Sequence, residues 1–184
     1  MVKRCEWAIE EPNLSYHDKE WGVPQRNDQK LFEFLILEGA QAGLSWVTIL
    51  KRREGYRKAF SNFDAKKVAK FNEKKISLLL KDDSIIRNRL KINSAINNAK
   101  QFLKVQKEFG TFDRYLWGFV DNKPIKNKFK KLSDLPSSTM TSEKMSADLK
   151  KRGFNFVGPT ICYALMQAIG MVNDHTTGCF RFGK

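Results

Sequence analysis

Helical periodicity runs through most of this 184-residue chain. From about residue 28 to residue 169, apolar side chains recur every three or four positions, the spacing that places them on one face of a helix. No segment of useful length alternates apolar with polar residues, and no segment repeats another. Because the core of a domain is built from such faces, the sequence predicts an all-α fold.

Capping and helix-breaking residues divide this region into predicted helices. They cover about residues 28–38, 45–60, 64–71, 76–80, 90–110, 111–120, 145–152 and 159–169. The first 26 residues are polar, aromatic and irregular, and the segment 125–140 is a predicted loop rich in Lys and Ser. A chain of this length is expected to form one domain.

The charge of the chain points to its partner. There are 34 Lys and Arg residues against 20 Asp and Glu residues, a formal net charge of +14. This excess favours a polyanion, most simply nucleic acid, although a generally basic protein without such a partner is the alternative. The sequence contains neither an apolar run long enough to span a membrane nor a signal peptide, so we expect no membrane partner and a cytoplasmic location.

The stretch from Glu38 to Trp46 is a predicted joint between two helices. Gly43 interrupts the helical pattern, and Ser45 is a suitable N-cap for the second helix. Glu38 lies near the C-terminal end of an apolar helix, where the helix macrodipole disfavours a carboxylate. This position indicates a functional site, with a solvated helix-end residue as the alternative.

A second joint lies near the C-terminus. Gly153 and Gly158 bound a tight hairpin between a helix over 145–152 and a helix that begins at Pro159. Free backbone N–H groups at such a helix start can bind phosphate. The residues predicted to bind DNA here are Lys150, Lys151, Arg152, Gly153 and Gly158. An ordinary helical hairpin is the alternative.

Cysteine and histidine residues occur at both ends of the chain. Cys5 and His17 lie near the N-terminus, and His175 and Cys179 lie near the C-terminus. Two Cys and two His are the ligands of a closed, tetrahedral zinc site, which would staple the irregular N-terminal segment to the C-terminus. The alternative is that these residues are scattered and bind no metal. The third cysteine, Cys162, lies within a predicted helix and is assigned to the core.

A set of longer motifs extends over nearly the whole chain. In chain order these are Arg4-Cys5, Tyr16-His17-Asp18, Glu20-Trp21-Gly22-Val23-Pro24, Leu37-Glu38, Gln41-Ala42-Gly43-Leu44-Ser45-Trp46, Lys150-Lys151-Arg152-Gly153-Phe154, Phe156-Val157-Gly158, Val172-Asn173-Asp174-His175 and Cys179. Their length and order are specific. Together they resemble the DNA-3-methyladenine glycosylase I family of the helix-hairpin-helix glycosylase superfamily.

This resemblance implies a helix-hairpin-helix fold and hydrolysis of the N-glycosyl bond of 3-methyladenine in double-stranded DNA, which leaves an abasic site. The implied organisation is a monomer with one domain over residues 1–184. Its helical core covers residues 27–170, with the helix-hairpin-helix at about 142–169. The segments 1–26 and 171–184 are held together by one structural zinc ion.

The resemblance also implies the site residues. The zinc ligands are Cys5, His17, His175 and Cys179. The base pocket contains Tyr16, Glu38 and Trp46, with Trp7 and Trp21 close by. Asn13 stands where the family has an aromatic residue, and the segment before Tyr16 is about one residue shorter than in the family.

The chemistry of base removal fits these residue types. A glycosylase must flip the base out of the duplex, and Tyr16 and Trp46 offer aromatic faces that can stack on it. The methylated base is cationic, so aromatic rings and the carboxylate of Glu38 favour it over neutral adenine. Glu38 is therefore the candidate catalytic residue as well as a base-binding residue. Gly43 and Leu44 are also predicted to bind DNA. Leu44 is the candidate wedge that fills the gap left in the duplex, with packing in the core as the alternative.

The superfamily's usual catalytic aspartate has no clear counterpart. It lies about twenty residues after the last glycine of the hairpin, where this chain has Gly178. Asp174 is the nearest carboxylate, and we do not assign it to catalysis, although it could hold His175 in place.

Two other functions stay open at this point. One is a zinc-stapled DNA-binding protein without catalytic activity, and the other is a related glycosylase that removes a different damaged base. The grouping of Tyr16, Glu38 and Trp46 favours an enzyme, because a protein that binds only phosphates has no use for a base pocket.

Overall fold

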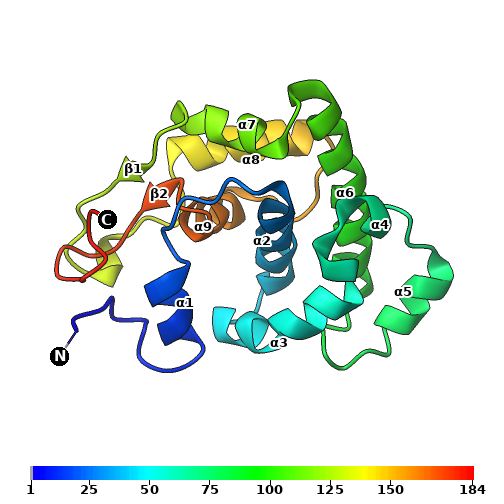
Figure 1. The fold of residues 1–184 in the computed structure, drawn as a ribbon, viewed down its shortest axis with the longest axis horizontal. Helices are drawn as coiled ribbons and strands as arrows, with labels where there is room; N and C mark the ends of the chain where they lie inside the picture. The colour runs from blue at the N-terminus through cyan, green and yellow to red at the C-terminus, as the bar shows by residue number, and fades with distance from the viewer. Residues whose placement is uncertain (1) are drawn as a thin grey trace.

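The computed structural model describes residues 2–184, and most of them lie in helices (Figure 1). The α-helices are α1 (Asn13–Lys19), α2 (Asp28–Gln41), α3 (Trp46–Ala59), α4 (Ala65–Val68), α5 (Glu73–Leu79), α6 (Arg89–Phe109), α7 (Phe112–Trp117), α8 (Met140–Lys151) and α9 (Pro159–Ala168). The described chain also contains the 3₁₀ turns η1 (Ser61–Phe63), η2 (Gly118–Val120) and η3 (Leu132–Asp134). Two short parallel strands, β1 (Ile125–Lys126) and β2 (Val172–Asn173), pair with each other.

Helix α2 lies in the middle of the molecule and packs against α3, α6, α7 and α9 (Figure 1). Every residue from Leu31 to Ala40 is buried, including Glu33 and Glu38. A helix that is buried on all sides has no solvent face, so its polar side chains must meet other protein groups or a cavity. The polar residues of α2 therefore show where the interior holds charge.

Capping contacts confirm three predicted helix starts. The side chains of Asn27, Ser45 and Asp64 accept hydrogen bonds from N–H groups in the first turns of α2, α3 and α4. The predicted helix ends at Gly110 and Gly153 are also confirmed. Both glycines have positive φ angles, 85° and 86°, in the left-handed region that favours glycine.

Some local predictions are wrong. The first 26 residues contain helix α1, which has no apolar stripe of its own and is held by the burial of Tyr16 and His17. The strands β1 and β2 are two residues long, too short to show alternation in the sequence. Leu90, the first apolar residue of the helix predicted over 90–110, is 71% exposed because it lies on the opposite side of α6 from Ile92 and Ile96.

The two ends of the chain lie side by side at one edge of the molecule (Figure 1). The N–H of Phe180 donates to the carbonyl of Lys3 at 2.9 Å.

The fold as a whole is mostly helical, as predicted. Among residues 2–184, no helix is both long enough and apolar enough to cross a lipid bilayer.

Candidate active site and metal centre

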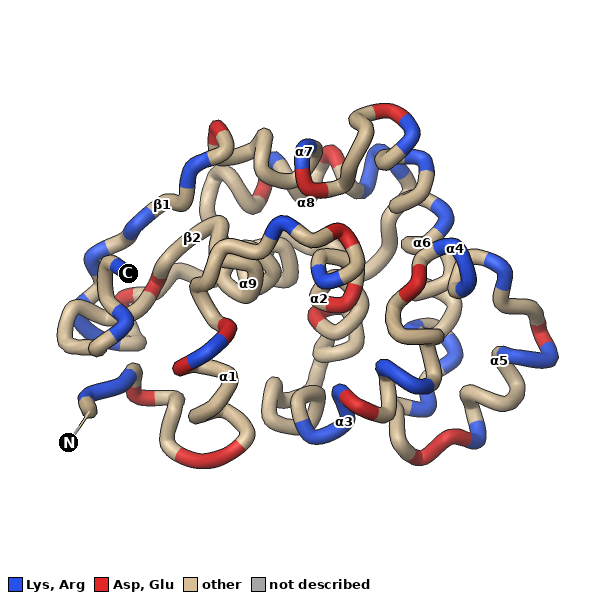
Figure 2. The backbone as a smooth tube through the Cα atoms, viewed as in Figure 1, with Lys and Arg blue, Asp and Glu red and all other residues tan. Residues whose placement is uncertain are grey.

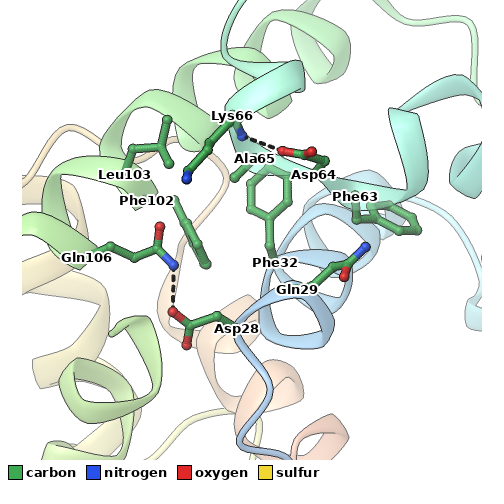
Figure 3. A pocket seen from close by; sticks show the side chains of 10 residues that line it. All are labelled: Asp28, Gln29, Phe32, Phe63, Asp64, Ala65, Lys66, Phe102, Leu103 and Gln106. Carbon is green, nitrogen blue, oxygen red and sulfur yellow. Dashed lines mark hydrogen bonds between the residues drawn. The ribbon is translucent and has the colours of Figure 1, made fainter. Parts of the chain in front are cut away.

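Two cavities lie at opposite ends of α2. The cavity at its N-terminal end, of about 330 Å³, is shown in Figure 3. Its carboxylates cap helices: Asp28 accepts hydrogen bonds from Gln106 Nε2 (2.6 Å) and from the Phe112 N–H (2.9 Å), and Asp64 caps α4. Because the protein itself satisfies these groups, this cavity is a gap between helix ends.

The cavity at the C-terminal end of α2, of about 370 Å³, has aromatic walls. It brings together the five residues predicted for a base pocket: Trp7, Tyr16, Trp21, Glu38 and Trp46. The ring centroids of Tyr16 and Trp46 are 5.4 Å apart, and those of Trp7 and Trp21 are 5.0 Å apart. Such walls suit a flat ring that carries a delocalised positive charge.

Glu38 supplies the carboxyl group of this cavity. It is 4% exposed, and no group within residues 2–184 donates a hydrogen bond to its carboxyl oxygens. Burial without a partner raises the pKa of Glu38 to about 8, because the charged form is poorly solvated there. Glu38 is therefore not a solvated helix-end residue, and that alternative is wrong.

Two other residues of the cavity wall have buried polar atoms without a partner in the described chain. These atoms are Nε1 of Trp46 and Oδ1 of Asn13. Asn13 Nδ2 donates to the carbonyl of Trp7 at 3.4 Å, which fixes the orientation of the amide. Unpaired buried polar atoms are rare in folded proteins. Together with Glu38, they leave a donor, an acceptor and a carboxyl group available to a ligand.

The cavity wall also contains residues that the motifs do not identify. Leu132 and Leu135 come from η3 and the position after it, within the predicted loop, and Gln167 comes from α9. No local sequence pattern connects these positions to the motifs, because they meet only in the folded chain.

Asp174 is buried and engaged away from the metal cluster. Its carboxylate accepts hydrogen bonds from Tyr163 Oη (2.5 Å), Gln167 Nε2 (2.8 Å) and Asn127 Nδ2 (2.7 Å). The expectation that Asp174 holds His175 is therefore wrong. Asp174 instead orients a residue of the cavity wall, Gln167.

The predicted zinc ligands form one buried cluster: Cys5, His17, His175 and Cys179. The Sγ atoms of Cys5 and Cys179 each lie 3.6 Å from His175 Nδ1, and Cys179 Sγ lies 3.4 Å from His17 Nε2. The two imidazole nitrogens are 3.2 Å apart. Zn–S and Zn–N bonds of about 2.3 and 2.0 Å in a tetrahedron place ligand atoms roughly 3.3–3.8 Å apart. These four separations agree with that range, and all four ligand atoms lie within 4.8 Å of one another, so the cluster could hold a metal ion.

The outward-facing nitrogens of the two histidines also have partners. His17 Nδ1 lies 2.8 Å from Asp18 Oδ1, and Arg4 holds the same carboxylate. His175 Nε2 lies 3.1 Å from the carbonyl of Trp21. Burial lowers the pKa of His175 to about 4, which keeps the imidazole in the neutral form that binds a metal. These contacts orient both rings toward the cysteine sulfurs.

The α8–α9 joint has the features of an anion site. Gly158 precedes Pro159 at the first position of α9, and Phe156 has a left-handed φ of 53°. Within the described residues, the N–H groups of Phe156, Val157 and Gly158 donate to no protein acceptor. Lys150 and Lys151 are exposed at the end of α8.

Arg152 differs from its two neighbours. Its guanidinium pairs with Glu108 (2.7 Å) and Asp148 (2.6 Å) and lies over the rings of Phe109 and Tyr115. Through these contacts the side chain of Arg152 attaches the end of α8 to α6. The geometry therefore argues against the prediction that Arg152 contacts DNA.

The α2–α3 joint projects an apolar side chain. Gly43 has a φ of 77°, and no atom lies near the position that a Cβ would occupy there. Leu44 is 39% exposed, so the alternative that it packs in the core is wrong.

Comparison with known proteins gives consistent matches over nearly the full length. A family model for methyladenine glycosylase matches residues 7–182. DNA-3-methyladenine glycosylase 1 of Escherichia coli strain K12 is 48% identical over 179 residues, which cover 97% of this chain and 96% of that protein. DNA-3-methyladenine glycosylase of Haemophilus influenzae is 47% identical over 180 residues, 97% of each chain. The structure of 3-methyladenine DNA glycosylase I from Staphylococcus aureus, solved to explain 3-methyladenine recognition, superposes with a TM-score of 0.95 at 35% identity and covers 98% of this chain and 97% of that one.

Proposed function

The chain belongs to the methyladenine glycosylase family, and from this premise we propose that it removes 3-methyladenine from alkylated double-stranded DNA. It does so by hydrolysing the N-glycosyl bond, which releases the free base and leaves an abasic site. The observation that carries this proposal is Glu38, a buried carboxyl group without a protein partner in a cavity with aromatic walls.

Base selection follows from the environment of Glu38. With a pKa of about 8, Glu38 is mostly protonated at neutral pH in the free protein. A cationic base in the cavity favours the ionised form, so binding of the cation and loss of the proton are coupled. Neutral adenine provides no such compensation. Tyr16 and Trp46 stack on the base, and Trp7 and Trp21 close the aromatic wall.

Bond cleavage needs little help from an acid. Water attacks the anomeric carbon of the deoxyribose and loses a proton to the solvent, while the electron pair of the glycosyl bond moves onto the base and neutralises its positive charge. No proton has to be added to this leaving group. The engagement of Asp174 by three hydrogen bonds agrees with a mechanism that does not use it as a catalytic acid.

DNA binding is assigned to two joints between helices. The helices α8 and α9 with residues 152–158 form the proposed helix-hairpin-helix, in which free N–H groups and two lysines, Lys150 and Lys151, bind phosphates. The glycines of this hairpin are Gly153 and Gly158. Leu44 enters the gap left by the flipped base. Arg152 attaches the end of α8 to α6 through Glu108 and Asp148 and does not contact DNA.

A zinc ion is assigned to the four-residue cluster. Cys5, His17, His175 and Cys179 fit a tetrahedral ion by donor type, burial and spacing. Zinc supplies no chemistry to the reaction and instead joins the segments 1–26 and 171–184. Metal analysis of freshly purified protein should give one zinc per chain. Cys5→Ser should lose the metal and lower the melting temperature, while far-ultraviolet circular dichroism should still show most of the helix content, because the helical core over 27–170 does not include the ligands.

The remaining assignments concern organisation. Residues 1–184 are proposed to form one domain that acts as a monomer. Light scattering coupled to size-exclusion chromatography should give the mass of a single 21.3 kDa chain.

The decisive experiment is base release. Incubation with methylated duplex DNA should liberate free 3-methyladenine, identified by mass spectrometry, and Glu38→Gln should reduce the yield. Lys66→Gln, at the cavity of Figure 3, is the matched control and should behave like the parent. Binding to the duplex without release of any base would instead identify a DNA-binding protein without catalytic activity.

A further inference from the structure

The loop between β1 and α8 reaches the mouth of the base cavity. Leu132 and Leu135 line the cavity together with Glu38 and Trp46. Leu132 is also 42% exposed, so one side of it faces the cavity and the other faces solvent. The residues on either side of Leu132 therefore lie next to the place where a flipped nucleotide would enter.

Four lysines precede Leu132 within six positions: Lys126, Lys128, Lys130 and Lys131. Figure 2 shows basic residues along the chain from β1 into this loop. Lys126 is used by the protein, since its Nζ donates to the carbonyl of Gly183 at 2.8 Å. In the described part of the chain, Lys128, Lys130 and Lys131 are exposed and form no ion pair with an acidic side chain.

The backbone of this loop is fixed by contacts on both sides. The N–H of Thr177 donates to the carbonyl of Phe129 at 2.8 Å, which ties the loop to the C-terminal segment. The carboxylate of Asp134 accepts hydrogen bonds from the N–H groups of both Lys130 and Lys131 at 3.2 Å. Asp134 thus binds the backbone at these positions and leaves both ammonium groups free. A fixed backbone holds the two side chains near the cavity at a low entropic cost.

We propose that Lys130 and Lys131 bind the backbone phosphates that flank the flipped nucleotide, with Leu132 against its sugar at the mouth of the cavity. This inference rests on the proposed function. The two phosphates that flank a nucleotide are attached to its sugar, so they lie near the mouth of the cavity when the base is inside. Lys131 and Lys130 are one and two residues before Leu132, and consecutive Cα atoms are about 3.8 Å apart. The loop is a DNA contact separate from the α8–α9 hairpin. The loop binds the phosphates of the extruded nucleotide, whereas the hairpin binds phosphates of the duplex.

The test compares two pairs of adjacent exposed lysines. The double variant Lys130→Gln/Lys131→Gln changes the loop, and Lys66→Gln/Lys67→Gln changes a pair at the opposite end of α2. Binding is measured to a duplex with a tetrahydrofuran abasic-site analogue across a range of salt concentrations. Loss of two phosphate contacts should lower the slope of log affinity against log salt by about 1.8 and weaken binding roughly tenfold at low salt. The control pair should leave both quantities near the parent values.

Neutral phosphates make the test specific to position. A methylphosphonate on either side of the tetrahydrofuran residue should weaken binding of the parent several-fold but have little effect on the loop variant, because the contact is already lost. Equal effects of the methylphosphonates on parent and loop variant would overturn the proposal, as would equal losses in the two lysine variants.

Two further measurements, binding of free 3-methyladenine and release of base from methylated DNA, test the proposed function separately from the loop contact. Free 3-methyladenine should bind the loop variant as it binds the parent, as monitored by tryptophan fluorescence, which shows that the cavity is intact. If the parent releases no base from methylated DNA, the proposed function fails. If base release is normal but the loop variant keeps the full salt slope, only the loop contact fails.

Discussion

Two glutamates on the same helix have opposite environments. Glu33 is 1% exposed and Glu38 is 4% exposed, and five positions on α2 separate them. Glu33 is surrounded by cations, with Lys30 Nζ at 2.8 Å, Arg53 Nε at 2.7 Å and Arg57 Nη2 at 3.0 Å. Glu38 has no such partner among the described residues.

The pKa shifts of the two carboxyl groups follow this difference. Burial alone would raise the pKa of Glu33, but the hydrogen bonds and charges of Lys30 and Arg53 outweigh burial, and its pKa is lowered. Burial raises the pKa of Glu38 to about 8 because no cation opposes it. Two carboxyl groups of similar burial therefore have different uses. Glu33 joins α2 to α3, whereas Glu38 has no protein cation, and in the proposed function the cationic base of the substrate takes that place.

The largest effect is expected at Glu33. Glu33→Gln removes the anion that compensates Arg53, which is 14% exposed in its side chain, and leaves a poorly solvated guanidinium. Loss of one member of a buried pair costs about 3–5 kcal/mol of unfolding free energy. Urea unfolding monitored by circular dichroism should show this loss. A change below about 1 kcal/mol would mean that Glu20, the other partner of Arg53, compensates fully.

At Glu38 the pH dependence of stability should have the opposite sign from that of a paired carboxylate. The pKa of Glu38 is about 8 in the folded protein, and the reference value of 4.5 applies to the unfolded chain. Between these two pH values the folded state keeps a proton that the unfolded chain releases. Stability is therefore unaffected below pH 4.5 and falls as pH rises toward 8. Between pH 6 and pH 8 the parent should lose about 2 kcal/mol relative to Glu38→Gln. Parallel curves for the two proteins over this range would show that Glu38 is ionised and solvated.

The same substitution should weaken ligand binding. Glu38→Gln keeps the size and one acceptor but removes the negative charge. A hydrogen bond to a charged group contributes about 1.5–3 kcal/mol, so the protonated, cationic form of 3-methyladenine should bind about one to two orders of magnitude more weakly. Binding to undamaged DNA should hardly change, because phosphate contacts dominate it. Unchanged titration of the pocket tryptophan fluorescence by 3-methyladenine would show that Glu38 does not contact the base.

The contrast between the two glutamates also marks the limit of sequence interpretation. Long motifs locate Tyr16, Glu38 and Trp46, and capping residues locate most helix starts. The sequence does not show that Glu33 is buried among cations, because these cations come partly from α3, twenty or more positions away.

The same limit explains the errors near the metal cluster. Asp174 is adjacent to His175 in the sequence, yet the cluster uses Asp18 and the carbonyl of Trp21 as outer partners. Loop residues such as Leu132 join the cavity only through tertiary contacts, for which the sequence carries no periodic signal.

The smallest expected effect comes from giving Glu38 the kind of partner that Glu33 has. Lys30 reaches Glu33 from three positions away on α2, and Gln41 lies three positions from Glu38 and lines the same cavity. Gln41→Lys should place an ammonium group beside Glu38 and lower its pKa by roughly one unit, equivalent to about 1.4 kcal/mol. The pH dependence of stability between pH 6 and pH 8 should then become shallower than in the parent. The cavity should also bind the protonated, cationic form of 3-methyladenine about tenfold more weakly, because the new cation takes the position of the ligand's charge. Gln41→Met is the neutral control of similar length and should keep both the steep pH dependence and the affinity. If Gln41→Lys binds the base as tightly as Gln41→Met does, then the positive charge of the ligand does not compensate the carboxylate of Glu38.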